Sequence, residues 1–327
     1  MKPVPCAIIF FLMIGSVLVS SCTAPLLCPF GPIEHAVVRP PNIARSPDLI
    51  LLTHDLLFET VARNMHPSWS PDSRELVFER APFHFKGDSG LCVIQADGSH
   101  PTMLWPIGGT GTMEPAWSPI GDWIACWVFD KHALMLLNRD GCQSHRVSDQ
   151  GYNPSWSPNG QRLVYERYLS DSDVDICLIN WDGTGFQTLL GGPTDARDPA
   201  WSPDGHRIAF ASNRDGTYNI YVMNVDGTQI TQITHAAGDP KRGMIQPTWS
   251  PDGTRIAFVC SSDSIYTRHG VLYAVDVAAG EPILLLDAKR CYDPAWSPDG
   301  DWLAFSYGGL DPSGPQGSDI YLLRMKQ

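Results

Sequence analysis

The stretch Pro199-Ala200-Trp201-Ser202-Pro203-Asp204-Gly205 decides the fold of this chain, because its core, Pro-x-Trp-Ser-Pro, occurs six times. Successive copies are 48, 39, 45, 48 and 47 residues apart. Their tryptophans are Trp69, Trp117, Trp156, Trp201, Trp249 and Trp296. A period in the forties with several short strands per unit is typical of a β-propeller.

Each repeat reads as four short strands. The strand that ends at Trp201 is followed by a Ser-Pro-Asp-Gly turn, in which proline fixes φ and glycine accepts a positive φ. Residues 207–211 and 219–223 read as the second and third strands, and an Asp-Gly hairpin leads to a fourth at 229–234. We therefore expect an all-β, six-bladed propeller with four antiparallel strands per blade.

The six tryptophans are best interpreted as packing between blades. A blade alone exposes both of its apolar faces, so neighbouring blades must cover them. A residue that recognises a ligand has no reason to recur in every blade, which argues against a ligand-stacking role. Truncating Trp201 to alanine is expected to cost about 3–5 kcal/mol of stability.

The two ends of the repeat region suggest how the ring closes. The last repeat stops after its third strand, near Met325, and two apolar segments, 48–52 and 57–61, precede the first Pro-x-Trp. We expect the N-terminal segment 57–61 to supply the missing outer strand of the last blade by mixed pairing. Closure of this kind removes exposed sheet edges.

The repeat resembles that of the TolB-type propeller, also called the WD40-like PD40 repeat. The resemblance rests on Trp-Ser-Pro-Asp-Gly at 201–205, Ile-Ala-Phe at 208–210 and Ile-Tyr-Val-Met-Asn-x-Asp-Gly-Thr at 220–228, and it covers about 48–327. It implies the fold strongly and the function weakly, because one fold hosts many activities. TolB-type proteins carry an α/β domain before the propeller, so we expect a lipoprotein form that lacks it.

The first 22 residues read as a targeting signal. An apolar run follows Lys2 and ends at Val19-Ser20-Ser21-Cys22, which resembles a bacterial lipobox with Cys22 as the lipidated residue. An uncleaved anchor or ordinary secretion are the alternatives, and all three place the protein outside the cytoplasm. Residues 23–47 are rich in proline and read as a tether. Thr23 after the cysteine suggests the periplasmic face of the outer membrane in a Gram-negative host.

Composition narrows the partners. The formal net charge is −12, and the sequence contains no run of lysine and arginine, so nucleic acid is not an expected partner. We expect a monomer that meets the membrane only through its lipid. Seven cysteines remain after Cys6 and Cys22, without zinc-type spacing; buried free thiols are the main expectation, with one surface disulfide as an alternative.

The connections separate two faces of the ring. Ser-Pro turns and most Asp-Gly hairpins fall on one face, and the variable connections fall on the other. We interpret the variable loops as a binding face, with tolerated insertions as the alternative. The candidate residues are Phe83, His84, Phe85, Tyr168, Tyr266, Arg268 and His269.

A second candidate site lies at the channel mouth. The residue before each Pro-x-Trp is polar in all six repeats and is expected where the innermost strand enters the axial channel. These residues are His66, Glu114, Asn153, Asp198, Gln246 and Asp293. Because the carboxylates come from alternate repeats, they could hold Ca²⁺, another divalent cation or a basic peptide group. The alternative is that strand starts beside a wet channel are polar anyway.

Two functions follow from these observations. The first is a non-catalytic binding or scaffold protein of the cell envelope that engages a protein or peptide. The second is a propeller hydrolase or lyase with a channel metal held by His66, Glu114, Asp198 and Asp293. No G-x-S-x-G or H-E-x-x-H motif occurs in the sequence, which favours the binding protein without a cofactor.

Overall fold

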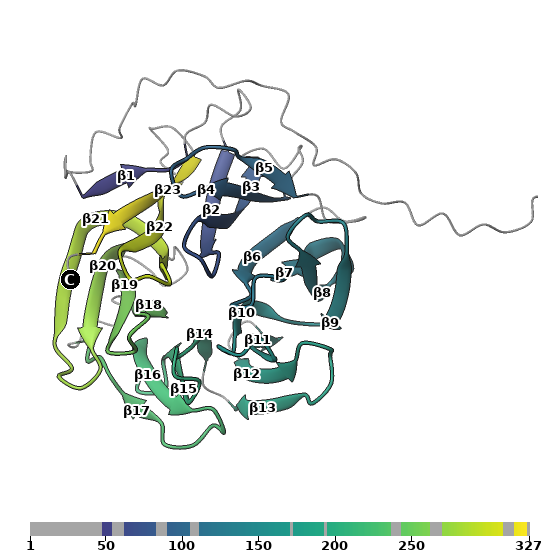
Figure 1. Ribbon diagram of the computed structural model, residues 1–327. Coiled ribbons are helices and arrows are strands. Elements are labelled where there is room, and N and C mark those ends of the chain that lie inside the picture. The colour runs from purple at the N-terminus through teal and green to yellow at the C-terminus, as the bar shows by residue number, and fades with distance from the viewer. Residues whose placement is uncertain are drawn as a thin grey trace, which may run out of the picture.

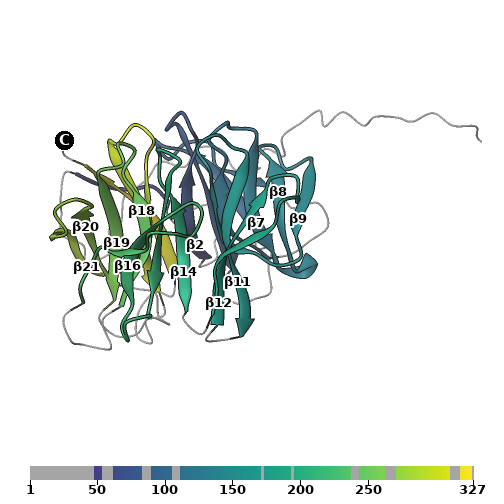
Figure 2. The ribbon, with the colours of Figure 1, turned by 90° about the horizontal axis from the view of Figure 1, so that it is seen from below.

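The computed structural model describes residues 48–53, 62–82, 90–104, 111–170, 173–192, 195–236, 243–261, 270–309 and 317–325. Across these ranges the chain forms twenty-three strands and one short 3-10 helix, η2 (Phe129–Lys131). Figure 1 shows the sheets arranged around a common centre. Figure 2 shows the same sheets from the side, where they stand next to one another in a single layer.

Three of the sheets contain four antiparallel strands each, paired in chain order. The first contains β6 (Thr112–Trp117), β7 (Trp123–Val128), β8 (Ala133–Asn138) and β9 (Ser144–Ser148). The second contains β10 (Tyr152–Trp156), β11 (Arg162–Ser170), β12 (Asp173–Asn180) and β13 (Gln187–Leu190). The third contains β14 (Ala196–Trp201), β15 (Arg207–Ser212), β16 (Asn219–Asn224) and β17 (Thr231–Gln232). The last of these strands is shorter than the expected 229–234.

The other strands form one continuous eleven-stranded sheet. Its first part contains β18 (Gly243–Trp249), β19 (Arg255–Ser261), β20 (Gly270–Asp276) and the long β21 (Pro282–Trp296). β22 (Trp302–Gly309), β23 (Gly317–Arg324) and β1 (Leu49–Leu51) follow. β2 (Ala62–Trp69), β3 (Glu75–Pro82), β4 (Gly90–Gln95) and β5 (Thr102–Leu104) complete it.

This large sheet is three four-stranded groups with two links. β21 pairs with β20 through its first half and with β22 through its second half, so it serves two groups. β23 meets β2 in a single parallel pair, Arg63 with Ser318. The fold is therefore an all-β propeller with four-stranded antiparallel groups. The blade number of six remains the prediction from the repeats.

An N-terminal strand completes the last group, but from a different segment than 57–61. β1 pairs antiparallel with β23, with Leu49 opposite Leu323 and Leu51 opposite Tyr321. The segment 57–61 lies outside the described residues. The outer position of the last group is therefore taken by 49–51, within the apolar segment 48–52. Its pairing with β23 is antiparallel rather than mixed.

The six tryptophans are buried, with exposed fractions between 6% and 8%. Each belongs to an apolar cluster that joins two or more consecutive groups. Trp117 packs with Val77 and Val93 of the preceding group and with Ile124 of its own. Trp69 packs with Ala304 and Leu322, so the same kind of cluster joins the last group to the first. Large aromatic side chains of this kind dominate the energetics of a packed interface.

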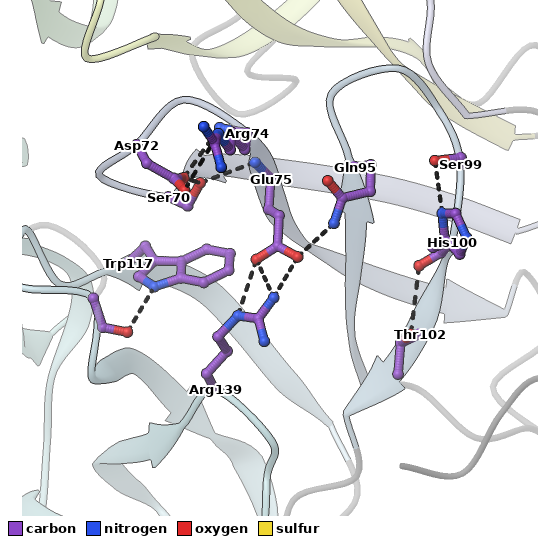
Figure 3. Close-up of polar contacts among 11 residues, drawn as sticks. Ser70, Asp72, Arg74, Glu75, Gln95, Ser99, His100, Thr102, Trp117 and Arg139 are labelled. Carbon is purple, nitrogen blue, oxygen red and sulfur yellow. Dashed lines mark hydrogen bonds and ion pairs between the residues drawn. The ribbon is translucent and has the colours of Figure 1, made fainter.

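Polar contacts add to these interfaces. The indole N–H of Trp249 donates to the carbonyl oxygen of Ala200 in the preceding group (3.1 Å), and the guanidinium of Arg207 lies over its ring at 4.8 Å. Glu75 occupies the position that corresponds to Arg207. Figure 3 shows that the Glu75 carboxylate instead bonds to Arg139 of the next group and to Gln95, beside Trp117.

Candidate functional site

The six residues before Pro-x-Trp lie inside the innermost strands, at a bulge, rather than at the strand starts. In β14, Asp198 and Pro199 together face the single residue Phe210, and the same two-against-one register recurs in all six repeats. All six residues have positive φ, between 46° and 56°. Such backbone is costly for residues other than glycine, so it persists only where neighbouring contacts hold it.

Three of these contacts are made by carboxylates. The carboxylate of one repeat accepts a hydrogen bond from the backbone N–H of the corresponding residue in the next repeat. Glu114 accepts from Asn153 (2.7 Å), Asp198 accepts from Gln246 (3.1 Å), and Asp293 accepts from His66 (3.2 Å). The left-handed residue thus presents its N–H to a neighbour, and the neighbour supplies the acceptor that a buried donor requires.

The amide side chains also reach from one repeat to the next, and here the amide nitrogen donates to the carboxylate of the next repeat. Asn153 Nδ2 donates to Asp198 Oδ1 (3.2 Å), and Gln246 Nε2 donates to Asp293 Oδ1. Gln246 Oε1 also accepts from the backbone N–H of Asp293 (3.0 Å). Glu166, fully buried on β11, accepts from Asn153 Nδ2 (2.7 Å) and from the backbone N–H of Asp198 (2.5 Å). The polar residues therefore join successive repeats.

His66 lies between two carboxylates. Its Nδ1 is 3.0 Å from Glu79 Oε2, and its Nε2 is 3.3 Å from Asp293 Oδ2. Burial lowers the pKa of His66, but Asp293 and Glu79, with a smaller contribution from Glu114, outweigh burial and raise this pKa to about 9. The imidazole is therefore protonated at neutral pH and donates from both nitrogens.

A cavity of about 580 Å³ lies above this layer of six residues. In most repeats the cavity is lined by the polar residue, by residues of the Pro-x-Trp segment that follows it and by the proline of the Ser-Pro turn. Several of these turn prolines are exposed to solvent. In five of the six repeats, the half-buried residue between proline and tryptophan lines the wall; Ala295 of the sixth repeat is not part of the lining. The polar layer is therefore the floor, and the cavity extends toward the face that carries the tight turns.

The surroundings of His66 bear on the proposed channel metal. The two carboxylates near His66 contact opposite nitrogens of one ring, so the three groups do not converge on one point. Within the described ranges, no group of three or more His, Cys, Asp or Glu side chains is arranged to hold a metal ion.

The loop residues are only partly described. Tyr168 is half-buried, with Tyr152 edge-on at 4.9 Å and the guanidinium of Arg197 at 5.5 Å from its ring. Burial raises its pKa, with Glu166 adding to the effect. The other candidates, Phe83, His84, Phe85, Tyr266, Arg268 and His269, lie outside the described residues, as does Cys22.

The cysteines divide into two kinds. Cys92, Cys126, Cys177, Cys260 and Cys291 are free thiols, and all but Cys260 are buried. Cys142 is disulfide-bonded. Among the described residues, no helix is long and apolar enough to cross a membrane.

Comparison with known proteins supports the architecture. The family model described as the TolB β-propeller domain matches residues 86–242 and, in an overlapping match, 125–309. No curated protein matches the chain. A TolB-like protein of Agrobacterium tumefaciens is similar in structure, with a TM-score of 0.63 and 24% identity over 81% of this chain and 91% of that chain.

Two solved enzymes share the fold. A gluconolactonase from Xanthomonas campestris has a TM-score of 0.60 and 15% identity, over 91% of this chain and 99% of that one. An oligogalacturonate lyase in complex with manganese has a TM-score of 0.54 and 16% identity, over 82% of this chain and 91% of that one. At these identities the likeness concerns the fold alone.

Proposed function

Since the chain belongs to the TolB β-propeller domain family, we propose that it is a non-catalytic binding protein of the cell envelope that holds a segment of a polypeptide partner. TolB-like propellers generally bind protein partners, and the family is periplasmic. The observation that carries the proposal is the cavity. Its volume, about 580 Å³, suits a few residues of a chain rather than a folded domain.

The lining supports a binding role over a catalytic one. The polar groups of the floor bond to one another between repeats, and the walls consist largely of proline and tryptophan. A wall of this kind is rigid, so binding against it costs little conformational entropy. Aromatic and proline surfaces also suit extended peptide segments.

Site-specific photocrosslinking tests the proposal. The photoreactive amino acid p-benzoylphenylalanine replaces Ala200 on the cavity wall, His84 on the variable-loop face or, as a control, Ala279, which is exposed in the turn after β20. We expect a polypeptide adduct from position 200 in the native envelope and none from position 279. The adduct should disappear when Ala116→Trp also fills the cavity. Adducts from position 84 alone would place the partner on the loop face, and the absence of adducts at both would contradict the proposal.

Anchoring is part of the proposal. We propose cleavage before Cys22, lipidation of Cys22, a tether over residues 23–47 and a monomeric propeller over 48–327. Labelling of cells with an alkyne fatty acid should mark the wild-type protein and leave Cys22→Ser unlabelled. Equal labelling of both would refute lipidation at this residue.

A further inference from the structure

The cavity walls alternate between two kinds of repeat. Repeats two, four and six place a carboxylate before the proline and an alanine after it, as Glu114-Pro-Ala, Asp198-Pro-Ala and Asp293-Pro-Ala. Repeats one, three and five place a histidine or amide before it and a hydroxyl after it, as His66-Pro-Ser, Asn153-Pro-Ser and Gln246-Pro-Thr. The repeats therefore fall into two classes of three, and the alanines of the second and fourth repeats, Ala116 and Ala200, line the cavity.

Two of the three hydroxyl groups, those of Ser68 and Ser155, accept hydrogen bonds from the backbone of the next repeat. Ser68 Oγ accepts from the backbone N–H of Trp117 (2.9 Å), and Ser155 Oγ accepts from that of Trp201 (3.0 Å). In the alanine repeats the corresponding side chain is a single methyl group. The cavity lining includes the alanines Ala116 and Ala200 beside the carboxylates of Glu114 and Asp198, so a guest on these walls meets a methyl group and a carboxylate together.

The lining carries more negative than positive side chains. It contains the carboxylates of Glu114, Asp198 and Asp293, the imidazolium of His66 and no lysine or arginine. The arginines at the start of the second strands lie over the tryptophan rings of the following repeats, and none of them belongs to the lining. They are Arg162 (5.3 Å), Arg207 (4.8 Å) and Arg255 (5.3 Å). The cavity thus holds an excess of negative charge between apolar walls, where charges attract more strongly than in open water.

We infer that the segment held in the cavity is basic, with a lysine or arginine side chain directed at the carboxylates of the alanine repeats; the inference rests on the proposed function. A carboxylate oxygen has two lone pairs, so an oxygen that accepts one hydrogen bond from the ring can accept another from a guest. A guest ammonium or guanidinium supplies such donors and offsets the charge excess.

The test measures fluorescence anisotropy of the purified protein with three labelled decapeptides. Their sequence is two copies of Gly-Ser-X-Gly-Ser, with X as lysine, glutamate or glutamine. We expect the lysine peptide to bind about tenfold or more tightly than the glutamate peptide, with affinity that falls as salt rises from about 50 to about 300 mM. Ala200→Trp should abolish binding, and Ala279→Trp should not.

Two conservative variants remove the charge and keep the acceptor. Glu114→Gln and Asp198→Asn should each weaken the lysine peptide about three- to tenfold, while Asp226→Asn, the same charge change in an exposed hairpin, should leave it unchanged. Unaltered thermal melting of the variants shows that the ring is intact.

The outcomes separate the inference from the proposed function. Equal binding of all three peptides, blocked by Ala200→Trp, would overturn the basic preference and leave the proposed function standing. Binding insensitive to Ala200→Trp would overturn both. Displacement of the lysine peptide by about 1 mM Ca²⁺, together with undiminished binding to Asp198→Asn, would overturn the inference in favour of a metal ion.

Discussion

The interface between the last and first repeats and the interface between the fourth and fifth repeats bury the same tryptophan in different surroundings. Trp69 and Trp249 are both 6% exposed, and both indoles donate to the carbonyl of the preceding Pro-x-Trp, at 3.0 and 3.1 Å. The interface at Trp249 joins segments that follow each other in the chain. The interface at Trp69, here called the seam, joins segments more than 200 residues apart.

The seam has additional buried polar bonds. Thr53 Oγ1 and Asn64 Nδ2 both donate to Asp319 Oδ1, at 3.1 and 3.3 Å, and Asn64 is fully buried. Ser318 Oγ donates to the carbonyl oxygen of Asn64 (3.1 Å), and His66 bonds to Asp293. Closing a long loop costs chain entropy that a short connection largely avoids. The comparison teaches that the ring adds buried polar contacts where the chain links the two sides only through β1, a short strand that is itself held by pairing.

The largest effect is expected from removing one side of the seam. Deleting residues 319–327 removes most of β23, together with Asp319 and the pairing partner of β1. The remaining repeats then expose an apolar face, so we expect loss of the single cooperative transition in differential scanning calorimetry. A truncated protein that melts in one transition at the wild-type temperature would contradict closure by this segment.

Trp69→Ala and Trp249→Ala compare the two interfaces directly. Each removes a buried indole and should lower the free energy of unfolding by about 3–5 kcal/mol, measured by urea denaturation. Only Trp69→Ala should also expose the chain ends, because the chain links the two sides of the seam only through β1, which is held to β23 by strand pairing. Limited proteolysis measures this exposure as the rate of cleavage near β1 and β23. Identical cleavage rates in the two variants would contradict the claim that only Trp69→Ala exposes the chain ends.

A smaller effect is expected from deprotonation of His66 at the seam. Its folded pKa, about 9, lies above the unfolded value, so its stabilisation is complete below about pH 6.5 and is lost as pH rises to about 9. The loss should reach at most about 3 kcal/mol in the free energy of unfolding. His66→Gln, which cannot titrate beside Glu79, Asp293 and Glu114, should lack this slope. Parallel pH profiles of the two proteins would refute the role.

The smallest effect is expected at the interior interface. Arg207→Gln removes the cation over the Trp249 ring and the contact with Asp204, both near the surface. Such a contact contributes about 0.5–1 kcal/mol, so the urea midpoint should shift only slightly. The matched change Arg74→Gln, on an exposed arginine, serves as the control. A loss above about 2 kcal/mol would mean that the surface contact matters more than the buried indole.

Much of the fold could be predicted from the sequence. The apolar segments 163–165 and 208–210 lie in second strands, and 272–275 in a third strand, as their pattern indicates. The sequence pattern predicts a closing strand from either 48–52 or 57–61, because both segments are apolar. Only the register with β23 identifies Leu49–Leu51 as the closing strand. Such a long-range register leaves no local signal in a single sequence.

The site was less predictable. A proline inside a strand indicates a bulge, and Pro199 after Asp198 is such a signal. Polarity alone predicts these residues at strand starts, whereas the proline pattern predicts them inside the strand. The partnership of His66 with Glu79 and Asp293 depends on ring closure, which brings together residues 227 positions apart. The protonation of His66 and the lack of convergence on a metal both follow from that three-dimensional arrangement.

The bulged prolines have one more consequence, for the kind of guest that the axis can admit. An exposed strand edge normally invites a foreign chain to join it through backbone pairing. Here every innermost strand carries, beside its bulge, a proline that has no N–H to offer, and the adjacent left-handed residue is out of register for pairing. The bulge therefore interrupts any backbone pairing between a visiting polypeptide and these strands. Selection among visiting polypeptides then depends mainly on their side chains, and the same interruption disfavours strand pairing between two copies of the protein through the cavity.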